Sequence, residues 1–331
     1  MDGATKTGGV QLQPQLIPEP QAVSQAARDY LNTPFWAGDR PRLDPDDLAG
    51  WQAEIDNVPQ PFAPLAAMML TQSGAKVEKA NLGGVEVYVA TPKGLAASDE
   101  DKAHIYIHGG GWAFMGGEAC AGQGAAQAGR LGYRTWSVDY RYPPFHRFPA
   151  ALDDCVTVYR ELLKTHRPEN IVISGGSAGG NLAAAAGLRI RDEGLPWPAA
   201  LGLMTPCTDG ALISDTVSVN DQLDFLKAAT MAEFWAVYAG GHDRKDPYLS
   251  PVYGDYSKGF PPTLLQTGTR DLLLSDTVRL HRAMRNGGVE AQLHVWEAMP
   301  HGGFGGIFGA PTPEDQEMSA ALVSFVDRVL G

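Results

Sequence analysis

The sequence predicts an α/β protein built around a mostly parallel sheet with helices on both of its faces. Short β-rich runs recur between residues 76 and 297, and helical stretches separate most of them. The chain has 331 residues, 44% of them hydrophobic, which is ample for a large core. This length lies at the upper end of what one core supports, so we expect one main domain with an appended or inserted part.

The strands are expected in a fixed order along the chain. Residues 76–92 alternate between apolar and polar around Gly83 and Gly84, which indicates a hairpin. Six further β-rich runs occupy residues 103–108, 134–140, 170–174, 200–206, 262–268 and 291–297. The clearest helix covers 148–163, where apolar side chains form one stripe and Pro149 suits the first turn.

Two regions lack a strand signal. Residues 1–20 read as a loose leader, and the helical patches that follow up to residue 75 are broken by prolines. Residues 207–260 contain the aromatic stretch LKAATMAEFWAVYAGG, which predicts another helix. We expect 1–75 to form an N-terminal helical cap segment and 76–331 the main domain, with a cap insertion at about 207–260 over the carboxyl edge of the sheet.

Charge and cysteine usage exclude several functional classes. The net charge is −12 and no block of Lys and Arg occurs, so nucleic acid and anionic membrane surfaces are not expected as partners. The three cysteines lie far apart and form no metal-type pairs, which fits reduced thiols in the cytoplasm. No signal peptide and no run of transmembrane length is visible, so we expect no stable membrane insertion.

The stretch ISGGSAGGN, residues 173–181, places one serine among four glycines at the end of a predicted strand. A phosphate-binding turn is excluded because Ser177 occupies the position of the middle glycine, and a P-loop would need G-K-[ST]. Residues 175–179 read instead as G-x-S-x-G between a strand and a helix. In that context a serine projects from a sharp corner as a nucleophile, so Ser177 is the predicted catalytic residue.

The run His108-Gly109-Gly110-Gly111-Trp112 follows another predicted strand. Consecutive glycines leave backbone N–H groups free to point into a cavity. Together with the N–H of Ala178, those of Gly109 and Gly110 are the predicted oxyanion hole for a tetrahedral intermediate.

A catalytic acid and base are expected after the serine, in the order Asp, His. Asp271 follows the predicted strand 262–268 and His301 follows 291–297, so both belong to the same sheet edge as Ser177. Asp276 is the alternative acid, but it lies at a predicted helix start, where a carboxylate serves as a cap. Activity should rise near pH 6.5 if His301 is unperturbed.

Taken together, the motifs resemble those of the hormone-sensitive-lipase-like esterases of the α/β-hydrolase fold. The likeness covers about residues 75–330 and includes HGGGW, DYRYPPFHRFPAALDD (139–154) and GGSAGGN. It implies an eight-stranded sheet under a helical cap, a triad of Ser177, Asp271 and His301, and no cofactor or metal. A homodimer is also plausible by resemblance. Two departures are Gly176, where the family commonly has aspartate, and YPPFHR in place of LAPEHP.

The sequence therefore predicts a serine carboxylic-ester hydrolase, a carboxylesterase that acts through an acyl-enzyme on short-chain or aromatic small-molecule esters. Lactone, carbamate or amide hydrolysis by the same triad stays open. A non-catalytic small-molecule receptor on the same scaffold is a distant alternative, because such receptors typically lose the histidine that is retained here. The predicted substrate pocket is walled by aromatic side chains, although each could equally pack cap helices on the core: Phe35, Trp36, Trp112, Phe225, Phe234 and Trp235.

Overall fold

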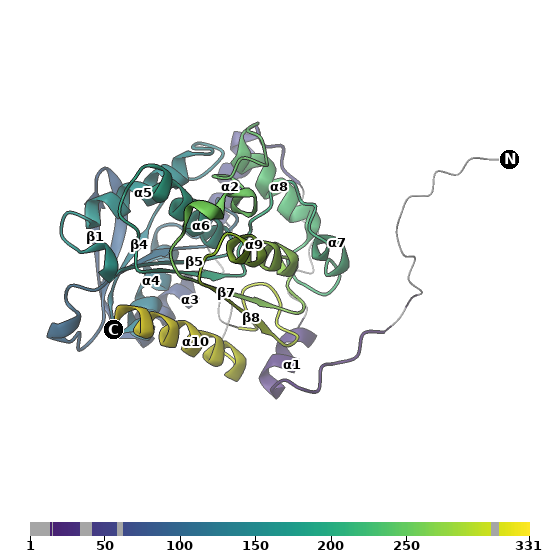
Figure 1. The fold of residues 1–331 in the computed structure, drawn as a ribbon. Helices are drawn as coiled ribbons and strands as arrows, with labels where there is room; N and C mark the ends of the chain where they lie inside the picture. The colour runs from purple at the N-terminus through teal and green to yellow at the C-terminus, as the bar shows by residue number, and fades with distance from the viewer. Residues whose placement is uncertain (1–13, 15, 34–41, 58–61, 306–310) are drawn as a thin grey trace.

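One eight-stranded sheet forms the centre of the protein in the computed structural model, which describes residues 14, 16–33, 42–57, 62–305 and 311–331 (Figure 1). The strand order is β1-β2-β4-β3-β5-β6-β7-β8. Strand β2 runs antiparallel to both of its neighbours, and every other pair is parallel. The strands are β1 Lys76–Leu82, β2 Val85–Thr91, β3 Ala103–Ile107, β4 Arg134–Val138, β5 Ile171–Gly176, β6 Ala200–Met204, β7 Thr263–Gly268 and β8 Ala291–Trp296.

The predicted α/β architecture is therefore confirmed, with a strand in each of the predicted regions. The α-helices are α1 Gln25–Asn32, α2 Leu48–Asn57, α3 Ala63–Ser73, α4 Glu118–Leu131, α5 Ala150–Leu162, α6 Ala178–Asp192, α7 Thr216–Val219, α8 Ala228–Ala239, α9 Leu274–Asn286 and α10 Pro313–Leu330. Short 3₁₀ turns are η2 Ala97–Asp99, η3 Pro168–Asn170, η4 Pro251–Tyr253 and η5 Tyr256–Lys258.

The two faces of the sheet carry different helices, α5, α6 and α9 on one and α4 and α10 on the other (Figure 1). Successive strand residues point to opposite faces, so Ile171 and Ile173 join the core under α5 and α6, while Val172 joins the core under α10. Because both faces are covered, the central strands β3 and β5 are buried along nearly their whole length rather than at alternate residues.

The helix predicted at 148–163 begins slightly later than expected. Pro149 is the N-cap of α5, with φ −97° and ψ 17°, and the first helical residue is Ala150. The predicted position of Pro149 in the first turn is therefore wrong by one residue, although the missing N–H of proline costs nothing at either position.

Residues 207–260 contain α7, α8, η4 and η5 and no strand. Helix α8 packs against α2 through a small apolar cluster that includes Trp51, Phe114 and Val237. Helix α3 packs along α4. Among the described helices, none combines the length and the apolar character needed to cross a bilayer.

The parallel arrangement brings four strand ends to one edge of the sheet. Ile107 ends β3, Gly176 ends β5, Gly268 ends β7 and Trp296 ends β8, and all four strands run in the same direction. The residues that follow these ends are those singled out by the motifs, and this edge therefore holds the candidate site.

Candidate active site

Ser177 occupies a tight corner between β5 and α6. Its backbone has φ 55° and ψ −122°, a conformation that is costly for a residue with a side chain and persists only where the surroundings enforce it. The Ser177 N–H donates to the carbonyl of Met204 (2.9 Å), and its carbonyl accepts from the N–H of Asn181 (3.1 Å). The corner is thus held from β6 on one side and α6 on the other.

The glycines around Ser177 are required by close backbone packing. A Cβ on Gly175 would lie 2.8 Å from the carbonyl oxygen of Ile107, and one on Gly179 would overlap that same oxygen. Gly176 differs, because the nearest atom to a Cβ there is the Met204 carbonyl oxygen at 3.7 Å. The corner needs glycine at 175 and 179 but has room for a side chain at 176.

A chain of hydrogen bonds joins the three residues predicted as nucleophile, base and acid. The distance from Ser177 Oγ to His301 Nε2 is 2.8 Å, and His301 Nδ1 lies 3.0 Å from Asp271 Oδ1. Asp271 is fully buried and also accepts from the Thr267 hydroxyl (2.6 Å) and the Leu273 N–H (2.9 Å). These bonds fix the carboxylate, and the carboxylate in turn orients the imidazole ring.

Asp224 is a further acidic residue beside this chain, and sequence reasoning missed it. Its carboxylate accepts from the backbone N–H of Leu272 (2.6 Å) and from that of His301 (3.2 Å to Oδ1). These two hydrogen bonds fix the backbone at His301 and at Leu272, the residue next to Asp271. Burial, and then the nearby Asp271 charge, raise the pKa of Asp224 to about 7, whereas the His301 charge opposes this.

The pKa of His301 is raised above its ordinary value. Burial alone would lower this pKa, but the charge and hydrogen bond of Asp271 outweigh burial, and the charges of Asp224 and Asp276 add to them. The expectation of an unperturbed histidine therefore needs correction, and the neutral, proton-accepting form requires a pH above 6.5.

Asp276, the alternative acid, has a different role in the structure. It lies in the first turn of α9 and accepts from the backbone N–H groups of Thr208 (2.8 Å) and Asp209 (3.0 Å). Burial raises its pKa to about 7. The carboxylate that bonds to His301 is thus that of Asp271, and Asp276 anchors the start of the 207–260 segment.

The glycine run after β3 lies beside Ser177. A Cβ on Gly109 would approach Ser177 Cβ to 3.3 Å, and Gly110 has φ +102°, which glycine adopts readily. Within the described residues, no hydrogen bond is donated by the N–H groups of Gly109, Gly110 and Ala178. Backbone donors without acceptors can stabilise an anion that forms beside them.

Comparison with known proteins agrees with this geometry. The family model described as the alpha/beta hydrolase fold matches residues 104–304. The chain belongs to this α/β-hydrolase family.

Solved structures and curated relatives refine the family assignment. The crystal structure of an esterase, E25, superposes with a TM-score of 0.84 at 34% identity, covering 97% of this chain and 98% of that one. EstE7, a hormone-sensitive-lipase homologue from a metagenome library, gives a TM-score of 0.75 at 32% identity, covering 88% of this chain and 100% of that one. An acetyl-hydrolase of Streptomyces hygroscopicus is 33% identical over 210 residues, covering 62% of this chain and 69% of that protein. The resemblance to hormone-sensitive-lipase-like esterases is therefore confirmed.

The hydrolase has a cavity of about 640 Å³ that reaches Ser177 and His301. Phe225 and Phe234, two of the predicted pocket residues and both from the 207–260 segment, are among the residues that line it. Figure 1 shows α8 of this segment near α2, on the same side of the molecule. The cavity wall therefore combines residues that follow strand ends with residues from helices outside the sheet layers.

Trp112 and Trp235 do not line this cavity, so their predicted role is wrong. Both are fully buried, their rings lie 4.4 Å apart, and Trp112 stacks on Tyr238 at 4.5 Å. Aromatic side chains gain more from complete burial than from a half-exposed wall, and these three form a core between α8 and the glycine run. Phe35 and Trp36 lie outside the described residues.

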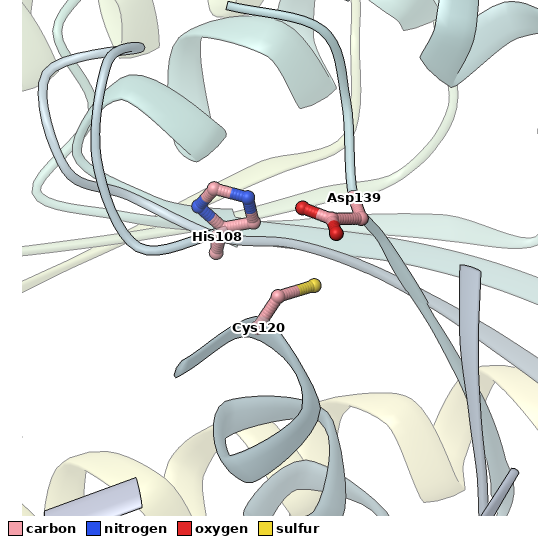
Figure 2. A group of neighbouring side chains, drawn as sticks. All are labelled: His108, Cys120 and Asp139. Atoms are coloured by element: carbon pink, nitrogen blue, oxygen red, sulfur yellow. The ribbon is translucent and has the colours of Figure 1, made fainter. Parts of the chain in front are cut away.

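His108, the first residue of the HGGGW run of the hydrolase, lies beside the buried Cys120 and the half-buried Asp139 (Figure 2). His108 Nδ1 donates to the Gly109 carbonyl (2.8 Å), and the His108 ring stacks on Tyr140 at 4.3 Å. The other ring nitrogen, Nε2, points toward the Asp139 carboxylate and has no hydrogen-bond partner among the described residues (Figure 2).

This cluster is one of two groups of described residues whose donor atoms lie close enough to hold a metal ion, within 4.8 Å of one another; the other contains Asp224, Asp271 and His301. Burial raises the pKa of the Cys120 thiol well above its usual value and that of Asp139 to about 6, and lowers that of His108 to about 4. Of the three, only His108 is bonded to the glycine run, because Asp139 accepts from the Gly117 N–H (3.2 Å) and Cys120 Sγ lies 3.1 Å from Ser137 Oγ.

Asn181, the last residue of the GGSAGGN motif, connects the serine corner to the 207–260 segment. Its side-chain amide donates to the carbonyls of Cys207 (2.8 Å) and Leu249 (2.9 Å). The sequence placed this residue in a motif but gave it no role. Both bonds are buried, so they fix the two ends of that segment against α6.

Proposed function

We propose that the protein hydrolyses short-chain or aromatic carboxylic esters through an acyl-enzyme on Ser177. Membership of the α/β-hydrolase family and the similarity to esterases support carboxylic-ester hydrolysis as the reaction. The single observation that carries the assignment of residues is the hydrogen-bond chain from Ser177 Oγ through His301 to Asp271.

In the first half of the reaction, Ser177 Oγ attacks the ester carbonyl carbon while His301 Nε2 accepts the hydroxyl proton. The carbonyl π electrons move onto oxygen and give a tetrahedral oxyanion. As this intermediate collapses, the bond to the alcohol oxygen breaks and His301 returns the proton to the leaving alcohol. Asp271 holds the ring in place and stabilises its protonated form.

In the second half, a water molecule takes the place of the alcohol. His301 accepts a proton from this water, whose oxygen attacks the acyl carbon. Collapse of the second tetrahedral intermediate breaks the bond to Ser177 Oγ, which recovers its proton from His301. The carboxylic acid leaves and the enzyme returns to its starting state.

The oxyanion is stabilised by the N–H groups of Gly109, Gly110 and Ala178. Their lack of other hydrogen-bond acceptors supports this role, because preorganised donors need no rearrangement as charge develops. One such donor is worth roughly 2.7–4 kcal/mol of transition-state stabilisation. No step requires a cofactor or a metal.

A helical cap determines which substrates bind. It consists of residues 1–75 and the 207–260 insertion, and the catalytic domain comprises residues 76–331. Cavity-lining residues from both parts support this division, among them Phe62 and Leu65 from the first, and Phe225 and Phe234 from the second. Aromatic rings near Ser177 favour apolar acyl or alcohol groups.

We also propose a cytoplasmic location and leave open a homodimer. Three free, buried cysteines support a reducing compartment. Light scattering coupled to size-exclusion chromatography would give the oligomeric state directly.

The test is hydrolysis of p-nitrophenyl acetate, butyrate, octanoate and laurate by the wild type, by Ser177→Ala and by Ser218→Ala. Ser218 is an exposed serine of α7 and serves as the matched control. We expect turnover that is fastest at short chains, that is lost in Ser177→Ala and that is unchanged in Ser218→Ala. Full activity in Ser177→Ala would refute the assignment, and no turnover on any ester would direct the search to lactones, carbamates or a binding function.

A further inference from the structure

The active-site cavity has a polar region formed by β3 and α4. Tyr106, Gln123, Gln127 and Arg130 line the same 640 Å³ cavity as Ser177. The Tyr106 hydroxyl donates to Gln123 Oε1 (3.0 Å), and Gln127, only 4% exposed, has an amide oxygen without a partner among the described residues. The ester reaction proposed above uses none of these groups.

Arg130 is the cation of this region. Among the described residues, Tyr106 and Asp315 act on its guanidinium only through their charges, and none accepts a hydrogen bond from it. The side chain is exposed, and both the cavity and a smaller neighbouring one of about 240 Å³ reach it. Desolvation by the surrounding protein lowers its pKa, while Tyr106 and Asp315 oppose this. A guanidinium with free donors at a cavity wall can hold an anion through charge-assisted hydrogen bonds.

The nearest acidic group does not supply that anion. Asp315 accepts hydrogen bonds from the backbone N–H groups of Phe304, Gly305 and Thr312, each at 2.9 Å, and from the Thr312 hydroxyl at 3.0 Å. Four donors therefore occupy its carboxylate as the cap of α10. Its charge is committed to the helix start, and Arg130 keeps its donors free.

Apolar side chains also line the cavity, among them Leu65 and Met69 from α3 and Met318 from α10. Charged side chains outside the region formed by β3 and α4 line it too: Arg42, Glu54, Lys227 and Glu233. A substrate that occupies the whole cavity would therefore meet catalytic groups, apolar side chains and charged groups that include the Arg130 guanidinium. A hydrocarbon chain with a terminal anion would contact the apolar side chains through its methylene groups and the guanidinium through its charge.

We infer that Arg130 forms an anion subsite that selects esters carrying a carboxylate remote from the ester carbonyl, such as half-esters of dicarboxylic acids. This inference rests on the proposed function, because it needs Ser177 as the nucleophile in the same cavity. A planar guanidinium binds a carboxylate with two parallel hydrogen bonds. The net charge of −12 disfavours the approach of anionic substrates, and a local cation offsets this repulsion.

The experiment compares paired substrates. Mono-p-nitrophenyl esters of glutaric, adipic and suberic acid test the acyl side, against p-nitrophenyl esters of straight-chain acids of matching length. Acetoxyalkanoates and the corresponding neutral alkyl acetates test the alcohol side. For each pair, the ratio of kcat/KM for the carboxylated substrate to that for the neutral one is measured in the wild type, Arg130→Gln, Arg130→Lys and Arg282→Gln. Arg282 is an exposed arginine of α9 away from the cavity and is the matched control.

For the acyl-side pairs, the alcohol-side pairs or both, we expect the ratio of kcat/KM (carboxylated over neutral substrate) to fall about tenfold or more in Arg130→Gln and to fall less in Arg130→Lys. In Arg282→Gln this ratio should stay within about twofold of the wild-type value. Neutral esters should react within about twofold of the wild-type rate in all variants. A ratio that is unchanged in Arg130→Gln on both sides overturns the inference. An equal loss on charged and neutral substrates also overturns it.

Binding separates the subsite from catalysis. Isothermal titration of monomethyl adipate and of neutral methyl hexanoate into Ser177→Ala should show tighter binding of monomethyl adipate, and adding Arg130→Gln should remove the difference. If esters are not hydrolysed but monomethyl adipate still binds through Arg130, the proposed function fails and the anion subsite stands. If Ser177→Ala does not distinguish monomethyl adipate from methyl hexanoate, the subsite is refuted, whether or not the Arg130 variants fold.

Discussion

The glycines on either side of Ser177 offer a sharp test, because local propensity and packing predict opposite results for the same substitution. Gly179 lies in the first turn of α6, where alanine is ordinarily preferred to glycine by about 1 kcal/mol. By propensity alone, Gly179→Ala would stabilise the protein. The structure predicts the reverse, because the new methyl group would overlap the carbonyl of Ile107 and lie 2.6 Å from that of His108.

The size of the destabilisation by Gly179→Ala depends on which atoms must move to relieve the overlap. Both carbonyls belong to backbone that leads from β3 into the glycine run, so relief requires a shift between β3 and α6 rather than a side-chain rotation. Overpacking of a tight core costs about 1–3 kcal/mol and occasionally more, and backbone contacts lie at the upper end. We expect Gly179→Ala to lower the free energy of unfolding by about 3 kcal/mol. Gly175→Ala should behave alike, with a Cβ 2.8 Å from the Ile107 carbonyl oxygen.

Gly176→Ala is the matched control. Its added methyl group would lie 3.7 Å from the nearest atom, and its φ is not positive, so the unfolding free energy should stay within about 1 kcal/mol of wild type. Urea denaturation gives the three free energies, and p-nitrophenyl butyrate hydrolysis gives kcat/KM. Wild-type stability and activity in Gly179→Ala, or equal damage from Gly176→Ala, would refute the packing argument.

Two further predictions concern pH. Since Asp271 raises the pKa of His301 in the folded enzyme, kcat/KM should rise with pH through a midpoint above 6.5, and a pH profile with its midpoint at or below that value would contradict this. Burial raises the pKa of Asp139 from 3.8 to about 6, so the folded state binds its proton more tightly and stability is lost as pH rises through that window. The Asp139→Asn variant has no such titration and does not lose this stability. The unfolding free energy of the variant minus that of the wild type, measured by urea titration, should therefore increase by roughly 1–2 kcal/mol between pH 5 and 7.5. A difference that stays constant over this range would count against the shifted pKa of Asp139.

The sequence predicted most of the fold because its signals were local. Each β-rich run became a strand, since short apolar runs between helices suit a sheet covered on both faces. Ser177, Asp271 and His301 could be found because each follows a strand end, and parallel strands bring those ends together. The room at Gly176 also accounts for the aspartate that resembling esterases commonly carry there.

Other features depend on tertiary contacts that no local pattern reports. Trp235 and Phe234 are adjacent in α8, yet one is fully buried in the core and the other lines the cavity. Only the packing of α8 decides which ring faces which way. Asp224 lies between Leu223 and Phe225 without any motif, and with Asp221 and Lys227 close by in the chain nothing distinguishes it from a surface carboxylate. The raised pKa of His301 likewise reflects three carboxylates, of which Asp271 and Asp276 follow β7 and Asp224 comes from the 207–260 segment.

The position of Asp224 has a consequence for engineering. The segment that would be exchanged to retarget the enzyme to other esters, residues 207–260, also supplies the carboxylate that holds the backbone of His301 and Leu272. Loop grafts from other hydrolases would therefore alter substrate preference and misalign the base in one step. A library that keeps Asp224 fixed, together with the Asn181 contacts at Cys207 and Leu249, separates these two effects and leaves the remaining positions free for selection.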